Sequence, residues 1–572
     1  MMNQGSAVNP RVISAIEHEK KVLTQYGVED IVALIESGQV ERAVGHSFHF
    51  SSAKLIREVS LQVKIAVEAE LQAAREDGSL LNYISYSLLM AVGLSSALIK
   101  WNVQKEFSSQ EIDALQGFYA VLVAKVPANN SVSKTLLEAY AEEVYHRYLT
   151  EARSKEDAAA GKAQVLTGSL SDYVKMMIDE VHQSSLYAYE MHSEGDPLEA
   201  ETVWGNDYGL FLQFALWCGA SFQTTNPPLV KAAWDTYAQD WKKRTSVLYK
   251  SLDFSTLKSG GLDADQKKVS VLSYTIVEKS CHLVRDMYLQ CAGRLGFVCY
   301  QVNPNHQNNV DLMVDEIRFV HAMMSQRLGH GYEPNISFKI PGTLGGLKAA
   351  EIVGKDGISI TVTLSFSVFQ AVAFGKVLAK STSAVSSVVI MNGRLAFPVR
   401  DDLVGMFPED KETYLKSSEL VGVDVTKHLY EKLYAPKGKG GLGIDPKRVR
   451  IMNASLRIYG DEIPDVLDVW GSPSITIFPN VRHALSIKKR DYSFDAVKLP
   501  VDADVRNTNA KSEIFRQSWW VEGDDAKLAP QQKLSLHDSS PEAIVTWGPI
   551  AATQAQFVGS YQSTKELIGF LG

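Results

Sequence analysis

The pattern of apolar positions divides the chain into a helical first part and an alternating second part. From residue 10 to about residue 150, apolar residues recur at helical spacing in one segment after another. Beyond about residue 195, short apolar runs alternate with amphipathic helical segments, which is typical of a parallel sheet with helical crossovers. Between the two parts, residues 151–164 (EARSKEDAAAGKAQ) lose the apolar periodicity, and we expect a linker there.

The second part contains eight short apolar runs, and eight is the number of strands that closes a barrel. The runs lie at residues 202–207, 220–226, 296–303, 335–340, 358–364, 387–392, 448–455 and 474–480. We therefore predict an α/β fold with a (β/α)8 barrel over residues 195–490 and an additional all-helical N-terminal region over residues 1–150. Residues 151–194 would form a linker and a lead-in helix. Residues 491–572 would form a C-terminal extension that covers the active site or builds a homo-oligomer.

Composition and charge narrow the class of protein. Of the 572 residues, 45% are hydrophobic and 22% are charged, as in ordinary soluble globular proteins. A net charge of -8 without a basic run argues against a nucleic-acid partner. The longest uncharged run, residues 78–99, contains Asn82 and several serines, so we expect a buried core helix and no membrane span.

The cysteines and histidines predict neither a disulfide framework nor a metal site. The cysteines form no C-x-x-C pair, which fits buried thiols in a reducing compartment, the cytoplasm; they are Cys218, Cys281, Cys291 and Cys299. His46 and His49 in GHSFHF, and His146 four residues after Glu142, lack further ligands in the sequence, so we expect structural roles for them.

Residues 335–343, NISFKIPGT, place Lys339 inside an otherwise apolar strand. A charged ammonium is costly in such surroundings, so the pKa of Lys339 should fall and leave neutral amine, the form that attacks a carbonyl. The ordinary alternative is a lysine whose stem is buried and whose amine reaches water. Further polar residues near this strand would favour a reactive amine over a lysine that only reaches water.

Polar residues recur at the carboxyl ends of the predicted strands, where a barrel has its active site. Each alone would be a loop or capping residue, but together they share one rim of the barrel. They are Asp207, Thr224, Thr225, Asn226, Gln301, Lys339, Thr361, Thr363, Arg394, Ser455 and Arg457. The two arginines suit a phosphate, because a guanidinium presents a planar fork of donors.

A literal G-x-G-x-x-G occurs at Gly438, Gly440 and Gly443. A dinucleotide-binding loop needs a strand before it and a helix after it, whereas here a helix precedes and a strand follows. We therefore expect a surface loop at the other end of the barrel.

Several motifs resemble the transaldolase family, over roughly residues 200–485. They are TTNPPLV, NISFKIPGT followed by GLKAA, GISITVTLSFSVFQ, ASLR and SITIFPN, in the order in which the family has them. The resemblance implies a (β/α)8 barrel enzyme of the pentose phosphate pathway type. Such an enzyme cleaves a ketose phosphate through a lysine Schiff base and transfers a dihydroxyacetone unit to an aldose phosphate, without metal or organic cofactor.

The resemblance also implies a role for each residue of the rim. Lys339 would form the imine, Asp207 would transfer protons, and Asn226 and Thr363 would position the donor. The implied catalytic residues are Lys339, Asp207, Gln301 and Thr363, and the implied substrate-binding residues are Thr225, Asn226, Thr361, Arg394, Ser455 and Arg457. Of these, the two arginines and the serine would hold the phosphate of a sugar-phosphate substrate.

The sequence departs from the family pattern at four positions. Gln301 stands where the family has glutamate, Thr361 where asparagine is usual, and Val389 and Met391 where a serine and an aromatic residue are usual. These departures leave two alternatives to transaldolase: a fructose-6-phosphate-type aldolase, and a non-catalytic barrel that only binds sugar phosphates. The retained lysine, aspartate and two arginines favour an enzyme, because a scaffold needs none of them at one rim.

Overall fold

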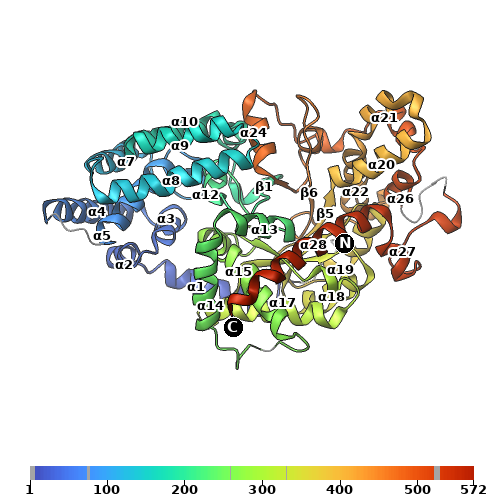
Figure 1. Ribbon diagram of the computed structural model, residues 1–572, viewed down its shortest axis with the longest axis horizontal. Coiled ribbons are helices and arrows are strands. Elements are labelled where there is room, and N and C mark those ends of the chain that lie inside the picture. Colours follow the sequence, from blue (N-terminus) through green and yellow to red (C-terminus); the bar gives the residue numbers. More distant parts are fainter. Residues whose placement is uncertain (1–6, 74–77, 258, 330, 521–527, 572) are drawn as a thin grey trace.

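The computed structural model describes residues 7–73, 78–257, 259–329, 331–520 and 528–571. Within these residues an all-helical N-terminal region lies beside a barrel of parallel strands surrounded by helices (Figure 1). The N-terminal helices, blue to cyan, gather at one end of the molecule, and the C-terminal helix in red crosses the front of the barrel. The predicted fold class is confirmed.

The N-terminal region consists of helices that pack around one another and against one side of the barrel. They are α1 (Pro10–Leu23), α2 (Val28–Glu36), α3 (Val40–His49), α4 (Ala53–Ala73), α5 (Gly78–Gly93), η1 (Ala97–Lys100), α6 (Val103–Glu106), α7 (Ser109–Ala124), α8 (Ser131–Thr150), α9 (Lys155–Thr167), α10 (Leu170–Gln183) and α11 (Ser185–His192). Local sequence sets their ends; for example, Ser108 and Glu111 form a capping box at the start of α7. As predicted, α5 is a buried core helix. None of the helices in the described part of the chain is long and apolar enough to cross a membrane.

The segment predicted as a linker is largely helical. Helix α9 begins directly after Ser154, whose hydroxyl accepts a hydrogen bond from the Asp157 amide. The small residues of α9 give little apolar signal in the sequence, but they allow the helix to pack closely on α8. A Cβ at Gly161 would lie 2.6 Å from the Tyr148 ring. The apolar pattern alone did not indicate this helix, because alanine and glycine can form a packed helix surface without large apolar side chains.

Within the described residues the barrel contains seven parallel strands in the order β1-β7-β6-β5-β4-β3-β2. They are β1 (Val203–Asn206), β2 (Val298–Gln301), β3 (Ile336–Pro341), β4 (Ser359–Thr363), β5 (Ser386–Met391), β6 (Val449–Ala454) and β7 (Ser474–Ile477). The eighth predicted strand, 220–226, closes the gap between β1 and β2, because Gln223 forms parallel bridges to Asn206 and to Val298. All eight predicted runs therefore lie side by side around the barrel.

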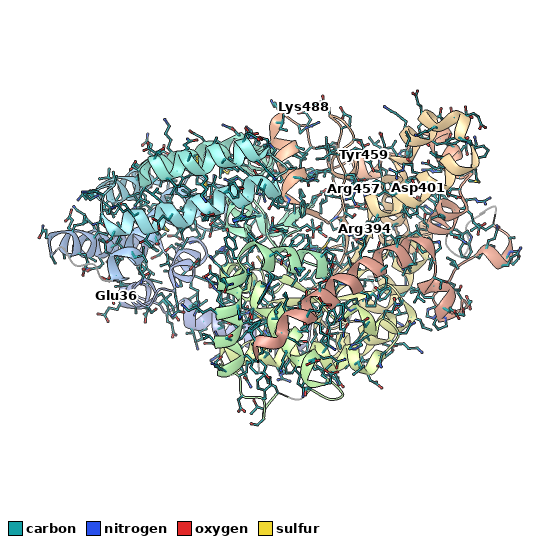
Figure 2. The ribbon with its side chains drawn as sticks, viewed as in Figure 1. Glu36, Arg394, Asp401, Arg457, Tyr459 and Lys488 are labelled. Atoms are coloured by element: carbon teal, nitrogen blue, oxygen red, sulfur yellow. The ribbon has the colours of Figure 1, made fainter. Side chains whose placement is uncertain are left out.

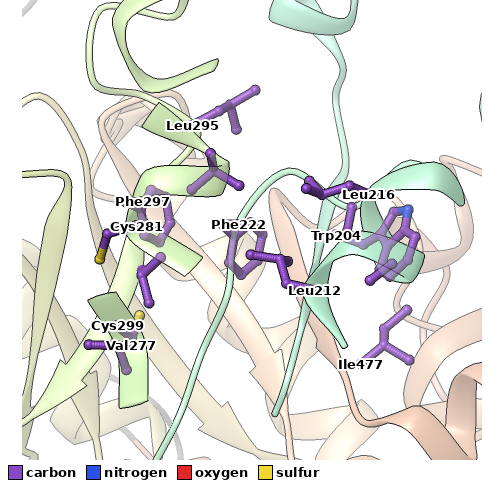
Figure 3. Packing of buried hydrophobic residues seen from close by; sticks show 14 of the residues in the cluster. Trp204, Leu212, Leu216, Phe222, Val277, Cys281, Leu295, Phe297, Cys299 and Ile477 are labelled. Carbon is purple, nitrogen blue, oxygen red and sulfur yellow. The ribbon is translucent and has the colours of Figure 1, made fainter. Parts of the chain in front are cut away.

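A buried aromatic pair supports this closing segment. The rings of Phe222 and Phe297 stack with their centroids 5.1 Å apart, and Trp204, Leu212 and other apolar residues surround them (Figure 3). Gly205 of β1 makes room for the Phe222 ring, since a Cβ there would lie 2.4 Å from it. The close approach keeps the short segment against the strand.

Helices surround the barrel and continue into the C-terminal extension. Around the strands lie α12 (Leu212–Trp217), α13 (Pro227–Thr236), α14 (Ala238–Ser251), α15 (Ala264–Leu283), α16 (Arg285–Gln290), η3 (Pro304–His306), α17 (Val310–Leu328), α18 (Leu344–Lys355), α19 (Val368–Leu378), α20 (Asn392–Met406), α21 (Lys411–Ser418), α22 (Val421–Tyr434), α23 (Pro464–Leu467) and α24 (Pro479–Ile487). The extension contains α25 (Ala503–Asn509), α26 (Glu513–Trp519), α27 (Pro541–Val545), α28 (Gly548–Lys565) and η8 (Glu566–Leu571). The glycine-rich loop at 438–443 joins α22 to β6, so it lies at the amino ends of the strands, as predicted.

The cysteines and the two neighbouring histidines are buried. All four cysteines are free thiols: Cys218, Cys281, Cys291 and Cys299. His46 forms hydrogen bonds with Ser51 and with the Leu23 carbonyl, and His49 forms one with Gln290. These contacts agree with the structural roles expected for the two histidines.

Candidate active site

Lys339 lies in β3 with its side chain buried inside the barrel. Its Nζ donates a hydrogen bond of 2.8 Å to the Thr225 carbonyl. Burial lowers the pKa of Lys339, and the charge of Asp207 opposes this effect. The strand register places Gln301 of β2 and Thr361 of β4 beside it. The lysine is therefore held in place by one backbone contact, with an enlarged fraction of neutral amine.

Asp207 follows β1 and shares the space around Lys339. Its Oδ1 accepts a hydrogen bond of 2.6 Å from the Thr224 hydroxyl. Burial raises the pKa of Asp207, whereas the charge of Lys339 and the Thr224 hydrogen bond act against the increase. Burial thus favours the neutral form of both groups, a lysine and a carboxyl that can exchange protons.

Two predicted binding residues on the closing segment have structural partners. Thr225 donates its hydroxyl to the Cys299 carbonyl at 3.0 Å, and its own carbonyl accepts from Lys339. Asn226 caps α13, since its Oδ1 accepts from the Leu229 amide at 3.0 Å. The Nδ2 group is therefore the part of Asn226 that could meet a ligand.

The two threonines of β4 are buried, and each contacts a neighbouring strand. The Thr361 hydroxyl lies 2.7 Å from the Ser337 hydroxyl and 3.5 Å from Cys299 Sγ. The Thr363 hydroxyl lies 3.9 Å from Met391 Sδ, a weak acceptor. Thr361 is thus occupied by a good hydrogen bond, while Thr363 is free to exchange a weak one for a ligand.

Gln301 presents a buried amide oxygen at the end of β2. Its Oε1 has no hydrogen-bond partner among the described residues, and a buried acceptor without a donor costs about 1–3 kcal/mol. The register partner of Gln301 is Lys339. A hydroxyl or a water bound next to the lysine amine would supply the missing donor.

Two arginines extend the site beyond the strand ends. Arg394 lies in the first turn of α20 and Arg457 follows β6, and Figure 2 shows both on the side of the barrel that α28 crosses. Burial and the charge of Arg457 lower the pKa of Arg394 to about 10. Two neighbouring guanidinium groups at a helix N-terminus favour a bound anion, which would relieve their repulsion.

The backbone brings the two arginine segments into close contact. The Gly393 amide donates to the Ser455 carbonyl at 3.0 Å, and a Cβ at Gly393 would lie 2.3 Å from Arg457 Cγ. Ser455 adopts a left-handed conformation with φ 59°, and its buried Oγ has no partner among the described residues. A non-glycine residue in this conformation is uncommon and marks strain that the surroundings enforce. The conformation leaves the Ser455 hydroxyl free to bind an anion.

Three residues that contact the two arginine segments could not be identified from the sequence. Asp465, buried on α23, accepts a hydrogen bond of 2.8 Å from the Arg457 amide. Burial raises the pKa of Asp465 to about 7. Gln556 of α28 accepts from Arg394 Nη1 at 2.8 Å, and the Phe557 ring lies 5.4 Å from the same guanidinium. No motif marks these residues, because their only signal is a contact between distant segments.

Helix α28 also reaches the opposite side of the rim. It packs against α13, α20 and η3, and its Gln554 donates to the Pro304 carbonyl. Tyr561 and Thr564 line a small cavity together with Asn226 and Gln301. The C-terminal helix therefore contacts predicted site residues on both sides of the barrel mouth.

The structure thus brings together most of the rim predicted from the sequence. Lys339, Asp207 and Gln301 lie around the inner space, and Arg394, Ser455 and Arg457 lie together farther out. Val389 and Met391, at the positions of two departures from the family pattern, are buried in β5. They add no polar group to the site.

Comparisons with known proteins show which family this chain resembles. The family model described as Transaldolase/Fructose-6-phosphate aldolase matches residues 214–528, more than half of the chain. A transaldolase of Neisseria gonorrhoeae is 28% identical over 175 residues, 30% of this chain and 44% of the relative. A transaldolase of Frankia alni is 26% identical over 228 residues, 37% of this chain and 58% of the relative.

The matches cover only part of the relatives and only part of the predicted site. The chain spans about half the length of the curated relatives that it matches. Asp207 precedes the matched segment, so its place in the site rests on the geometry alone. The segment that is matched contains Lys339, Gln301 and both arginines. The chain belongs to the transaldolase/fructose-6-phosphate aldolase family.

Proposed function

We propose that this protein is a transaldolase that cleaves a ketose phosphate through a Schiff base on Lys339 and transfers a dihydroxyacetone unit to an aldose phosphate. The observation that carries the proposal is the buried Lys339 amine of lowered pKa in the same space as Asp207. The buried free thiols support a reducing compartment such as the cytoplasm. The family match supports a place in sugar-phosphate metabolism of the pentose phosphate type.

The proposed reaction uses each group for a defined step. The neutral Lys339 amine attacks the ketose carbonyl, and the carbinolamine loses water to give an imine. The imine accepts the electron pair of the C3–C4 bond when that bond breaks, and Asp207 takes the proton from the C4 hydroxyl. The aldose phosphate leaves. The remaining enamine adds to the carbonyl of an acceptor aldose phosphate, which recovers the proton from Asp207, and water then releases the product.

The experiment that tests this function measures three-carbon transfer. Fructose 6-phosphate is incubated with the protein, with and without erythrose 4-phosphate or glyceraldehyde 3-phosphate as acceptor. We expect a seven-carbon ketose phosphate only when erythrose 4-phosphate is present. Release of free dihydroxyacetone without any transfer would instead establish the fructose-6-phosphate aldolase alternative, which the amide of Gln301 favours. Binding without cleavage would establish a non-catalytic sugar-phosphate protein.

Arg394 and Arg457 are expected to bind the phosphate of the substrate. Arg394→Ala and Arg457→Ala should each weaken the binding of phosphorylated ketoses by roughly 1.5–3 kcal/mol, because each removes a charge-assisted hydrogen bond. The measurement is KM for fructose 6-phosphate compared with KM for free fructose. Arg400→Ala serves as the matched control, since Arg400 lies on the same helix and pairs with Asp401. Equal losses for both sugars would show that the arginines are structural.

Gln301 should limit the rate of imine formation. A glutamine amide orients a water but cannot exchange a proton with it, which costs about 10- to 100-fold relative to a carboxyl in this place. We expect Gln301→Glu to raise the rate at which borohydride traps the imine, measured in a single turnover. Gln301→Met, of similar size and without a polar group, should lower it. A folded Gln301→Glu protein without activity would contradict the transaldolase proposal and point to a simple aldolase or a changed substrate.

A further inference from the structure

A buried cluster of charged residues joins the N-terminal helices to the barrel. We call it the Glu151 cluster; it consists of Arg147, Glu151, Arg153, Glu180 and Arg482. Glu151 Oε1 lies 3.1 Å from Arg147 Nη1 and 3.2 Å from Arg482 Nη2. The side chains of these three residues are only 1–2% exposed. Burial alone would raise the pKa of Glu151, but the charges of Arg147, Arg482 and Arg153 lower it to about 2.

Arg482 links this cluster to the segment that contains Asp207. Its Nη1 donates a hydrogen bond of 3.2 Å to Asn206 Oδ1. Asn206 is fully buried at the end of β1, and its Nδ2 donates to the carbonyls of Tyr208 and Leu210 at 3.0 Å each. One asparagine side chain therefore closes the loop that begins with Asp207 and is itself held by Arg482.

The far end of the same loop is held by Arg482 and also by Arg147. The loop continues into α12, whose Phe214 ring lies 4.0 Å from the Arg147 guanidinium and 5.1 Å from that of Arg482. A guanidinium over an aromatic ring is attracted to the ring face, more strongly when both groups are removed from water. Phe211, just before the helix, adopts a left-handed conformation with φ 60°, which a non-glycine residue keeps only when its neighbours enforce it. The loop is fixed at both ends by groups that Glu151 neutralises.

We propose that Glu151 and Arg482 are positioning residues for Asp207, so that the N-terminal helical region is part of the catalytic apparatus. Glu151 orients Arg482, Arg482 orients Asn206, and Asn206 fixes the loop that presents the Asp207 carboxyl to Lys339. The inference rests on the proposed function, in which Asp207 transfers the proton of the cleavage step. A displacement of about 1 Å of a reacting group can cost about 100-fold in rate.

A second buried ion pair between the same two parts of the protein provides a matched control. Glu19 of α1 pairs with Arg285, and both side chains are 1–4% exposed. Arg285 also donates to the Glu333 carbonyl and to Asn335, at the start of β3. This pair therefore anchors the N-terminal region at the amino ends of the strands, away from Asp207. Glu19→Gln removes the same charge as Glu151→Gln without touching the Asp207 loop.

The test compares Glu151→Gln, Arg482→Lys and Glu19→Gln in the full chain. We expect Glu151→Gln to lower kcat about 10- to 100-fold while KM for fructose 6-phosphate stays within about twofold. Arg482→Lys keeps the charge but loses the planar fork, so an intermediate loss is expected. Glu19→Gln should keep kcat within about threefold of the wild-type value, even if its melting temperature falls as far as that of Glu151→Gln. Equal kcat for Glu151→Gln and wild type, or equal losses in Glu151→Gln and Glu19→Gln, would overturn the proposal.

A second measurement separates this inference from the proposed function. Hydrogen exchange of the peptide over residues 203–217 should be faster in Glu151→Gln than in wild type and unchanged in Glu19→Gln. If the wild-type protein forms no Lys339 adduct, the proposed function fails, while the exchange comparison still decides whether Glu151 holds the loop. If Glu151→Gln does not fold, Asn206→Ser provides a second test. It removes the side chain that links Arg482 to the loop and leaves the Glu151 cluster intact, so the same faster exchange and the same loss of kcat are expected. Unchanged exchange in both variants would overturn the proposal.

Discussion

Lys339→Ala should lose turnover by at least about 10³-fold, which corresponds to about 4 kcal/mol of activation free energy. The amine of Lys339 is the group on which the proposed imine forms, and alanine offers no nucleophile in its place. Incubation with fructose 6-phosphate and borohydride should add mass to the wild-type peptide that contains Lys339 and leave the variant unmodified. Binding of the phosphorylated sugar should persist, because Arg394 and Arg457 remain.

The control for this experiment is Lys348→Ala. Lys348 is an exposed lysine on α18, the helix that follows β3, so its replacement tests whether any lysine of the same segment supports trapping. Its turnover and its adduct should equal those of the wild type. An adduct that forms on another lysine, or one that persists in Lys339→Ala, would contradict the assignment of the imine to Lys339.

Asp207→Asn should lower turnover by about 10²–10⁴-fold, the range that a positioned acid or base supplies. An amide keeps the shape of the side chain but cannot accept the C4 hydroxyl proton. Phosphate binding should remain, since both arginines are unchanged, and titration of the protein with fructose 6-phosphate measures it. Asp235→Asn, at an exposed aspartate of α13, should keep full activity.

The same substitution predicts a shift in pH dependence. The negative charge of Asp207 raises the pKa of Lys339, against the lowering by burial. The asparagine variant lacks this charge, so the pKa of Lys339 should fall further and neutral amine should persist to lower pH. Modification of Lys339 by an amine-selective reagent, followed by mass mapping, should therefore move to lower pH than in the wild type. An unchanged pH profile would show that the two groups do not interact.

The strands and the inner site could be predicted from the sequence because both depend on local pattern. The alternation around Lys339 indicates a buried strand, and polar residues at strand ends must meet at one rim once the strands are parallel. Even the segment 220–226, where only Gln223 forms bridges, was recognised from its apolar run. Asp207, Gln301 and the two arginines follow from the same geometry.

What could not be predicted depends on contacts between distant segments. Arg394 and Gln556 lie 162 positions apart in the chain, and no local pattern connects them. Glu151 and Arg153 belong to a stretch rich in charges, which the sequence alone assigns to solvent. In the structure Arg147 and Arg482 neutralise Glu151, so a residue typical of a surface is buried. Only the fold shows which charges find partners.

Alkylation of the buried thiols can report which part of the protein opens first. Burial raises the pKa of Cys218 and of Cys299 to about 11, so neither forms the thiolate that an alkylating reagent needs while the fold is closed. Cys218 ends α12 at the contact with the N-terminal helices, and Cys299 lies inside the barrel beside Thr361. Under mild denaturant, the order in which the two are alkylated would distinguish detachment of the helical region from opening of the barrel.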